Sequence, residues 1–151
     1  MHYANKWSAD FVVTHLTWKD DSLDRKKVVD LASDTKSKFC DLADRYKLLI
    51  NIEFGGYSGH FHEPEQFVDF VKDHSSLGIC IDIGHTSLIS GIRDRNFFKD
   101  IEIMAPYTRS IHVWNTKGLD HNKKHNHVPV HPSQKAEDGW VDIKKTLEII
   151  L

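Results

Sequence analysis

The sequence is poor in cysteine and has no surplus of positive charge, and each shortage excludes a class of protein. Among its 151 residues there are two cysteines, Cys40 and Cys80, which fall in a helical and a strand pattern. We therefore expect both to be reduced core residues and expect no disulfide framework. The formal net charge is -2, and without a basic excess a nucleic acid is an improbable partner.

Long apolar runs are also missing. None approaches the roughly 20 residues that cross a bilayer, so we expect no contact with a membrane. The first ten residues, MHYANKWSAD, lack the basic-then-apolar pattern of a secretory signal. A cytoplasmic location is therefore expected. Hydrophobic residues make up 40% and charged residues 28% of the chain, which is typical of a single globular domain spanning residues 1–151.

What is present is an alternation of strand-like and helical segments. Apolar and β-branched residues predict strands at residues 9–16, 48–54, 77–83 and 111–115. Helical spacing predicts helices at residues 23–46, 65–74, 86–90, 96–107 and 143–151, with residues 20–22 capping the first of them. Strands alternating with helices indicate an α/β fold with right-handed crossovers and a parallel sheet.

Three polar side chains recur near the carboxyl ends of these strands. Glu53, Asp82 and His112 follow one another at intervals of about 30 residues, one in each β/α unit. In a parallel α/β barrel the strand ends aim at a common centre, so the three should converge. Two carboxylates and an imidazole form a coherent ligand set for a divalent cation.

The stretch LGICIDIGHT, residues 77–86, carries the sharpest signal. Asp82 interrupts an apolar run, where an ionised carboxylate is costly unless a cation pairs with it. His85 follows at the turn after the strand and is a second candidate metal ligand or neighbour of the site. The alternative is that Asp82 only caps the next helix and that His85 is merely polar.

Histidine is the one residue type in excess. There are eleven, and four fall in the polar segment 116–138, which we expect to be a long loop: His121, His125, His127 and His131. Of these, His127 and His131 are expected to face the cavity.

Four β/α units make only half of a closed eight-stranded barrel. Such a piece exposes two edge strands and one sheet face that would be covered in a complete barrel. The final helix ends in the apolar run LEIIL, which agrees with this interpretation. We expect a truncated or split barrel, completed by missing sequence or by another copy of the chain; the alternative is a self-sufficient open sheet, which gel filtration would reveal as a compact monomer.

The ordered series ADFVVTHL, NIEF, ICIDIGH, IHVWN and GWVDI resembles the xylose isomerase-like TIM barrels, a family that includes sugar isomerases, sugar 3-epimerases and endonuclease IV. The resemblance covers nearly the whole chain and about half to two-thirds of the full barrel. It implies a divalent ion (Mn, Mg, Co or Zn) held by Glu53, Asp82 and His112. The family's closing glutamate, from the last strand, has no counterpart here.

The resemblance also implies roles for other side chains. Glu53, or the glutamate that closes the family's site, would move the proton as general base and acid. His85 would touch the substrate or, in the endonuclease branch, bind a further metal, and in that branch His15 would also be a ligand. Substrate would contact His15, His85, Trp114, Lys117 and His127. Trp114 could instead fill the barrel interior. Lys117 stands where the epimerases have an arginine, and it would hold a phosphate or hydroxyl as a point charge.

Three functions remain open from the sequence. The first is a metal-dependent isomerase or epimerase whose ion polarises the carbonyl of a sugar or sugar phosphate for proton transfer. The second is an endonuclease IV-like phosphodiesterase on abasic DNA, which the charge of -2 disfavours. The third is a non-catalytic barrel remnant that binds a metal or a partner.

Overall fold

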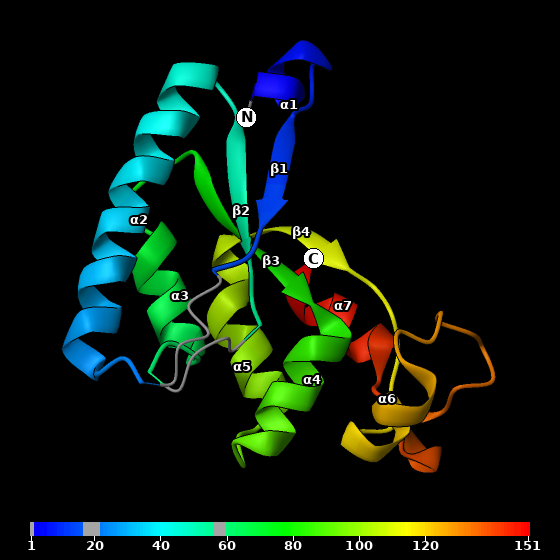
Figure 1. The fold of residues 1–151 in the computed structure, drawn as a ribbon. Coiled ribbons are helices and arrows are strands. Elements are labelled where there is room, and N and C mark those ends of the chain that lie inside the picture. Colours follow the sequence, from blue (N-terminus) through cyan, green and yellow to red (C-terminus); the bar gives the residue numbers. More distant parts are fainter. Residues whose placement is uncertain (1, 17–21, 56–59) are drawn as a thin grey trace.

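Four parallel strands form one sheet in the order of the sequence. The structure is a computed structural model that describes residues 2–16, 22–55 and 60–151. The strands are β1 (Phe11–Thr14), β2 (Leu49–Glu53), β3 (Leu77–Asp82) and β4 (Thr108–His112), and each pairs with the next (Figure 1). Because every connection returns to the same end of the sheet, all four strands finish at one edge.

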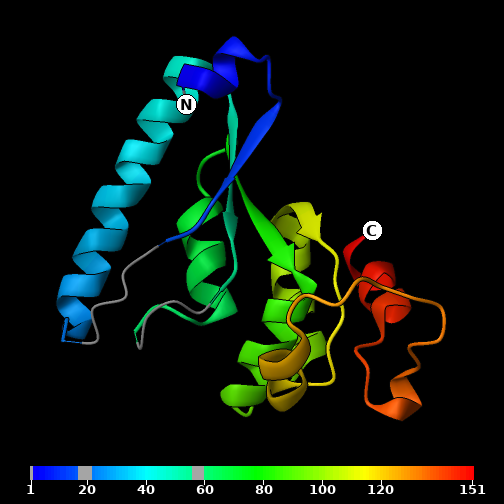
Figure 2. The same cartoon turned by 45° about the vertical axis from the view of Figure 1, so that its right-hand side comes forward.

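Helices line one face of this sheet. The helices are α1 (His2–Lys6), α2 (Arg25–Tyr46), α3 (Pro64–Val71), α4 (Ile83–Ile92), α5 (Phe97–Met104), α6 (Leu119–His125) and α7 (Ile143–Ile150). Figures 1 and 2 show α2, α3, α5 and α7 in a row, with neighbours in the row in contact. In the part of the chain that the structure describes, no helix is both long and apolar enough to cross a membrane.

The core lies between the sheet and this row of helices. Alternate residues of the two central strands point toward the helices and are fully buried, among them Ile50, Ile52, Ile79 and Ile81. Burial of each such side chain contributes about 1.5–3 kcal/mol. The other face of the same strands therefore carries the remaining alternate positions, which are mostly polar.

The predicted α/β order is confirmed, but the fourth strand was misplaced. It spans Thr108–His112 rather than residues 111–115, and its pairing ends with Asp82 opposite His112. The reason is that Asp82 is the last residue of β3 and the next residue begins α4, so residues after His112 have no strand to pair with. The β-like residues Val113 and Trp114 lie beyond the sheet.

Other boundaries also differ from the prediction. Helix α2 begins at Arg25, capped by Asp24, whose side chain accepts from the Lys27 backbone N–H at 2.8 Å. Of the predicted cap, Asp20 and Asp21 lie outside the described residues. The expected loop 116–138 instead contains α6 and a 3₁₀ turn (Ala136–Asp138), and an antiparallel bridge between Asn115 and Val128 folds it back toward the end of β4.

Candidate metal centre

Glu53 is the centre of a cluster of imidazoles at the carboxyl edge of the sheet. It is the last residue of β2 and is only 2% exposed. Its Oε1 lies 3.0 Å from His15 Nε2 and 3.4 Å from His85 Nδ1, and its Oε2 lies 3.0 Å from His112 Nδ1. Each carboxylate oxygen therefore faces at least one imidazole nitrogen.

Asp82 ends the neighbouring strand and has two tasks. Its Oδ1 caps α4 by accepting the His85 backbone N–H at 2.8 Å. Its Oδ2 lies 3.5 Å from His85 Nδ1 and 3.7 Å from His112 Nδ1. The cap fixes the carboxylate in place and leaves one oxygen directed at the same imidazoles that surround Glu53.

Trp114 holds this arrangement together from outside the sheet. Its indole Nε1 donates to Asp82 Oδ1 at 2.6 Å, and the side chain is buried. A methyl group added at Gly84 would overlap the indole ring, so only glycine admits the tryptophan there. The rings of His85 and Trp114 both contact His127, with centroids 5.1 Å and 4.3 Å away, which brings the predicted His127 to the site.

The electrostatics favour charge separation within the cluster. Burial is the largest single influence on the Glu53 carboxyl and opposes ionisation, but the hydrogen bond from His85 and the charges of His15 and His112 outweigh it, so the pKa of Glu53 falls below its usual value. The hydrogen bond to Glu53 raises the pKa of His85; burial opposes this shift and the charge of Asp82 supports it. Glu53 is therefore a carboxylate at neutral pH, the form in which it binds a cation.

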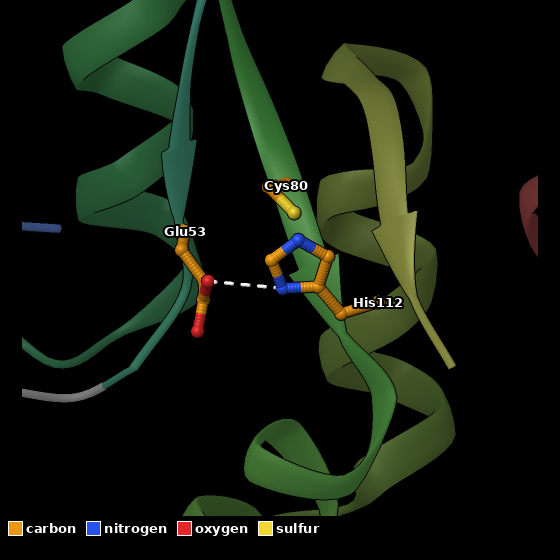
Figure 3. Close-up of side chains that lie close together, drawn as sticks. All are labelled: Glu53, Cys80 and His112. Atoms are coloured by element: carbon orange, nitrogen blue, oxygen red, sulfur yellow. Dashed lines mark ion pairs between the residues drawn. The ribbon is translucent and has the colours of Figure 1, made fainter. Parts of the chain in front are cut away.

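The donor set fits a divalent cation. Ligand atoms of Glu53, Asp82 and His85 all lie within 4.8 Å of one another, and the same holds for Glu53, Cys80 and His112. Figure 3 shows Glu53 and His112 facing each other from β2 and β4, with Cys80 on the strand between them. Carboxylate oxygen with imidazole nitrogen is a donor set that divalent metals accept.

Most of the predicted site residues meet here. Glu53, Asp82, His85 and His112 form a candidate metal-binding group, and His15, Trp114 and His127 lie against it. Lys117 does not join them: its Nζ lies 5.0 Å from the ring centroid of Trp140. His131 is placed in a local turn, with its Nδ1 2.8 Å from Ser133 Oγ.

Cys80 is the site neighbour that the sequence interpretation assigned only to the core. It is fully buried, and burial raises the pKa of its thiol to about 11. The sequence spacing could have indicated this position, because Cys80 precedes Asp82 by two residues on one strand and therefore shares its face.

Comparison with known proteins places the chain in a family. The family model of the xylose isomerase-like TIM barrel matches residues 1–150, and the chain belongs to this family. The resemblance inferred from the sequence is thus confirmed. No curated protein matches the chain.

Solved structures show the same fold at low identity. A xylose isomerase domain protein from Planctomyces limnophilus is 19% identical, with a TM-score of 0.55 over 73% of this chain and 37% of that chain. The probable 3-DHS dehydratase AsbF from Bacillus anthracis, involved in petrobactin synthesis, is 14% identical, with a TM-score of 0.57 over 74% and 40%. The 3-keto-D-glucoside 4-epimerase YcjR from E. coli, in its apo form, is 10% identical, with a TM-score of 0.57 over 97% and 65%.

These matches define the four strands as part of a barrel. The chain spans between 37% and 65% of the length of these three structures. The expected partial TIM barrel is therefore confirmed: the parallel sheet and its helices are consecutive β/α units of the larger fold.

Proposed function

We propose that the chain carries the cation-binding part of a metal-dependent isomerase or epimerase that acts on a sugar or sugar phosphate. The observation that carries the proposal is the meeting of Glu53, Asp82, His85 and His112 at the carboxyl edge of the sheet. In barrels of parallel strands this edge is where catalytic groups lie. Residues 1–151 would act as one partial barrel domain, completed by further sequence or by another copy of the chain.

The names of two structural neighbours support this class of chemistry. One is a 3-keto-D-glucoside 4-epimerase, and inversion at a carbon beside a keto group is a reaction that removes and returns a proton next to a carbonyl. Another is a probable dehydratase. A carboxylate base beside a cation site is suited to proton transfer of this kind.

Each side chain then has a defined task. Glu53, Asp82 and His112 would hold the ion, which could be Mn, Mg, Co or Zn and would supply polarisation of the carbonyl when bound. Glu53 is the group proposed to accept and return the proton, with His85 hydrogen-bonded to it. The side chains of His15 and His112 are each 45% exposed, so they can also reach a hydroxyl of the substrate.

Trp114 and Lys117 have different proposed roles. Trp114 is only 5% exposed and donates to Asp82, so we assign it to positioning that carboxylate rather than to stacking on a sugar. Lys117 lies against Trp140. Its proposed contact with a substrate phosphate would require it to leave that ring. The His127 ring contacts that of Trp114 at a tilt of 46° and borders the site on the side of the segment after β4.

The direct assay is proton exchange in deuterated water. The protein, supplied with Mn²⁺ or Co²⁺, is incubated with a panel of ketoses and ketose phosphates, and deuterium at the carbon beside the carbonyl is measured by NMR. The proposal predicts metal-dependent incorporation that Asp82→Asn abolishes. If the protein binds the metal yet no ketose exchanges, the non-catalytic interpretation replaces the enzymatic one.

A phosphodiesterase is the second candidate because one carboxylate, Glu53, is flanked by three imidazoles, as a centre with several zinc ions would require. The net charge of -2 weighs against binding to DNA phosphates. A gel shift of an abasic duplex that weakens with added salt, together with strand cleavage, would favour this candidate over the sugar enzyme.

A further inference from the structure

Cys80 is placed beside Glu53 by the strand register. In the pairing of β2 with β3, Glu53 and Cys80 are direct partners, and β3 then pairs with β4 up to the pair Asp82 and His112. Because side chains alternate along a strand, the Cys80 thiol shares the face that carries Glu53, Asp82 and His112. Three adjacent strands thus each contribute one donor atom type, oxygen, sulfur and nitrogen (Figure 3).

The distances are compatible with one shared ion. Donor atoms of Glu53, Cys80 and His112 all lie within 4.8 Å of one another. Glu53 Oε2 faces His112 at 3.0 Å, whereas Oε1 faces His15 and His85. The two oxygens of the Glu53 carboxylate therefore face different imidazoles.

We infer that Glu53, Cys80 and His112 form a thiolate-containing cation position that selects a thiophilic divalent ion, Zn²⁺ or Co²⁺, over Mg²⁺ and Mn²⁺. The inference rests on the proposed function, because it shares Glu53 and His112 with the site described above, and it adds a ligand and a metal preference to that site. Soft sulfur donors favour zinc and cobalt, while magnesium and manganese prefer oxygen.

The binding step balances in protons and bonds. The Cys80 S–H bond would break, its proton would leave to the solvent, and a sulfur–metal bond would form beside those from the Glu53 carboxylate and the His112 imidazole.

The two cysteines of the chain make a clean spectroscopic test possible. Cys40 lies in α2, and Cys40→Ser leaves Cys80 as the only thiol. Titrating this variant with Co²⁺ should give a near-ultraviolet thiolate-to-cobalt charge-transfer band together with visible ligand-field bands. Adding Cys80→Ser should remove the charge-transfer band and lower Zn²⁺ affinity at least about tenfold, the loss that even an outer partner of a metal ligand causes.

The outcomes separate this inference from the proposed function. Ligand-field bands without a charge-transfer band in Cys40→Ser would overturn the role of Cys80 and leave the site of Glu53, Asp82, His85 and His112 standing. No cobalt bands at all would overturn both. The decisive measurement is the charge-transfer band of Cys40→Ser, in which Cys80 is intact, so the test does not depend on whether Cys80→Ser folds. Cys80→Ala, with its fold checked by circular dichroism, is a second variant that removes the thiol.

Discussion

The indole N–H of Trp114 donates to Asp82 Oδ1 across 2.6 Å, so a residue beyond the last strand fixes the carboxylate at the end of β3. Asp82 keeps its other oxygen for His85 and His112. The Trp114 side chain therefore supports a candidate metal ligand. Partners of metal ligands of this kind tune affinity without touching the ion.

Replacing Trp114 with phenylalanine should therefore weaken metal binding. Trp114→Phe keeps an aromatic ring against Gly84 but removes the donor to Asp82, and we expect metal affinity to fall about 10–100-fold. Isothermal titration with Mn²⁺ or Zn²⁺ measures this. Trp140→Phe is the matched control, because Trp140 packs on Lys117 and His121 away from Asp82, and it should leave the affinity unchanged. Equal losses in both variants would mean that Trp114 acts only through general packing.

The close packing of Trp114 on Gly84 predicts opposite effects for two glycines of the same helix. Gly84→Ala would push the added methyl group into the indole, and we expect destabilisation of roughly 1–3 kcal/mol. Gly91→Ala meets no atom within 4 Å and should be neutral or stabilise by about 0.4–1 kcal/mol. Urea unfolding of both variants checks the pair. A Gly84→Ala protein as stable as wild type would show that the tryptophan is not held where the structure places it.

The metal-free protein should lose stability as the pH rises past neutrality. The pKa of His85 is raised from 6.5 by the hydrogen bond to Glu53, so this interaction is fully present below that value and is lost as the pH rises through the folded-state pKa. Glu53 behaves in the opposite sense, since its pKa is lowered from 4.5 and its contribution is lost in acid. Urea unfolding in a chelator from about pH 3 to about pH 9 measures both limits.

A His85→Gln variant is the comparison for this profile. The glutamine cannot ionise, so the difference in unfolding free energy between wild type and variant should shrink toward alkaline pH. His74→Gln is a control from the turn between α3 and β3, where the imidazole pairs with Asp44 at 3.6 Å. A difference for His85→Gln that stays constant over the whole range would contradict the assigned interaction between His85 and Glu53.

The site was predictable to the extent that it depends on strand ends. Glu53, Asp82 and His112 each close a parallel strand, and parallel strands of one sheet finish at one edge, so spacing alone brought them together. The role of Trp114 was not predictable, because it depends on a segment after β4 folding back over Gly84. Propensity also misplaced β4 itself, since Val113 and Trp114 look strand-like but have no partner once β3 has given way to α4.

Cys80 shows a different limit. Its position two residues before Asp82 assigned it to the same face, but a buried cysteine usually has no role beyond packing. Only the register, which pairs it with Glu53, distinguishes it from Cys40 in α2. Local pattern identifies the donor types, and strand pairing decides which of them meet.

The central claim is that Glu53, Asp82 and His112 hold one divalent cation, and direct metal titration tests it most simply. Titration of the metal-free protein with Mn²⁺ and Zn²⁺ should show one bound ion. Glu53→Gln or Asp82→Asn should lower the affinity for that ion by at least about tenfold. Asparagine at position 82 keeps the helix cap, and Glu102→Gln, at an exposed position on α5, controls for loss of charge and should bind like wild type. A wild-type protein that binds neither ion, or a Glu53→Gln variant that binds as tightly as wild type, would contradict the account.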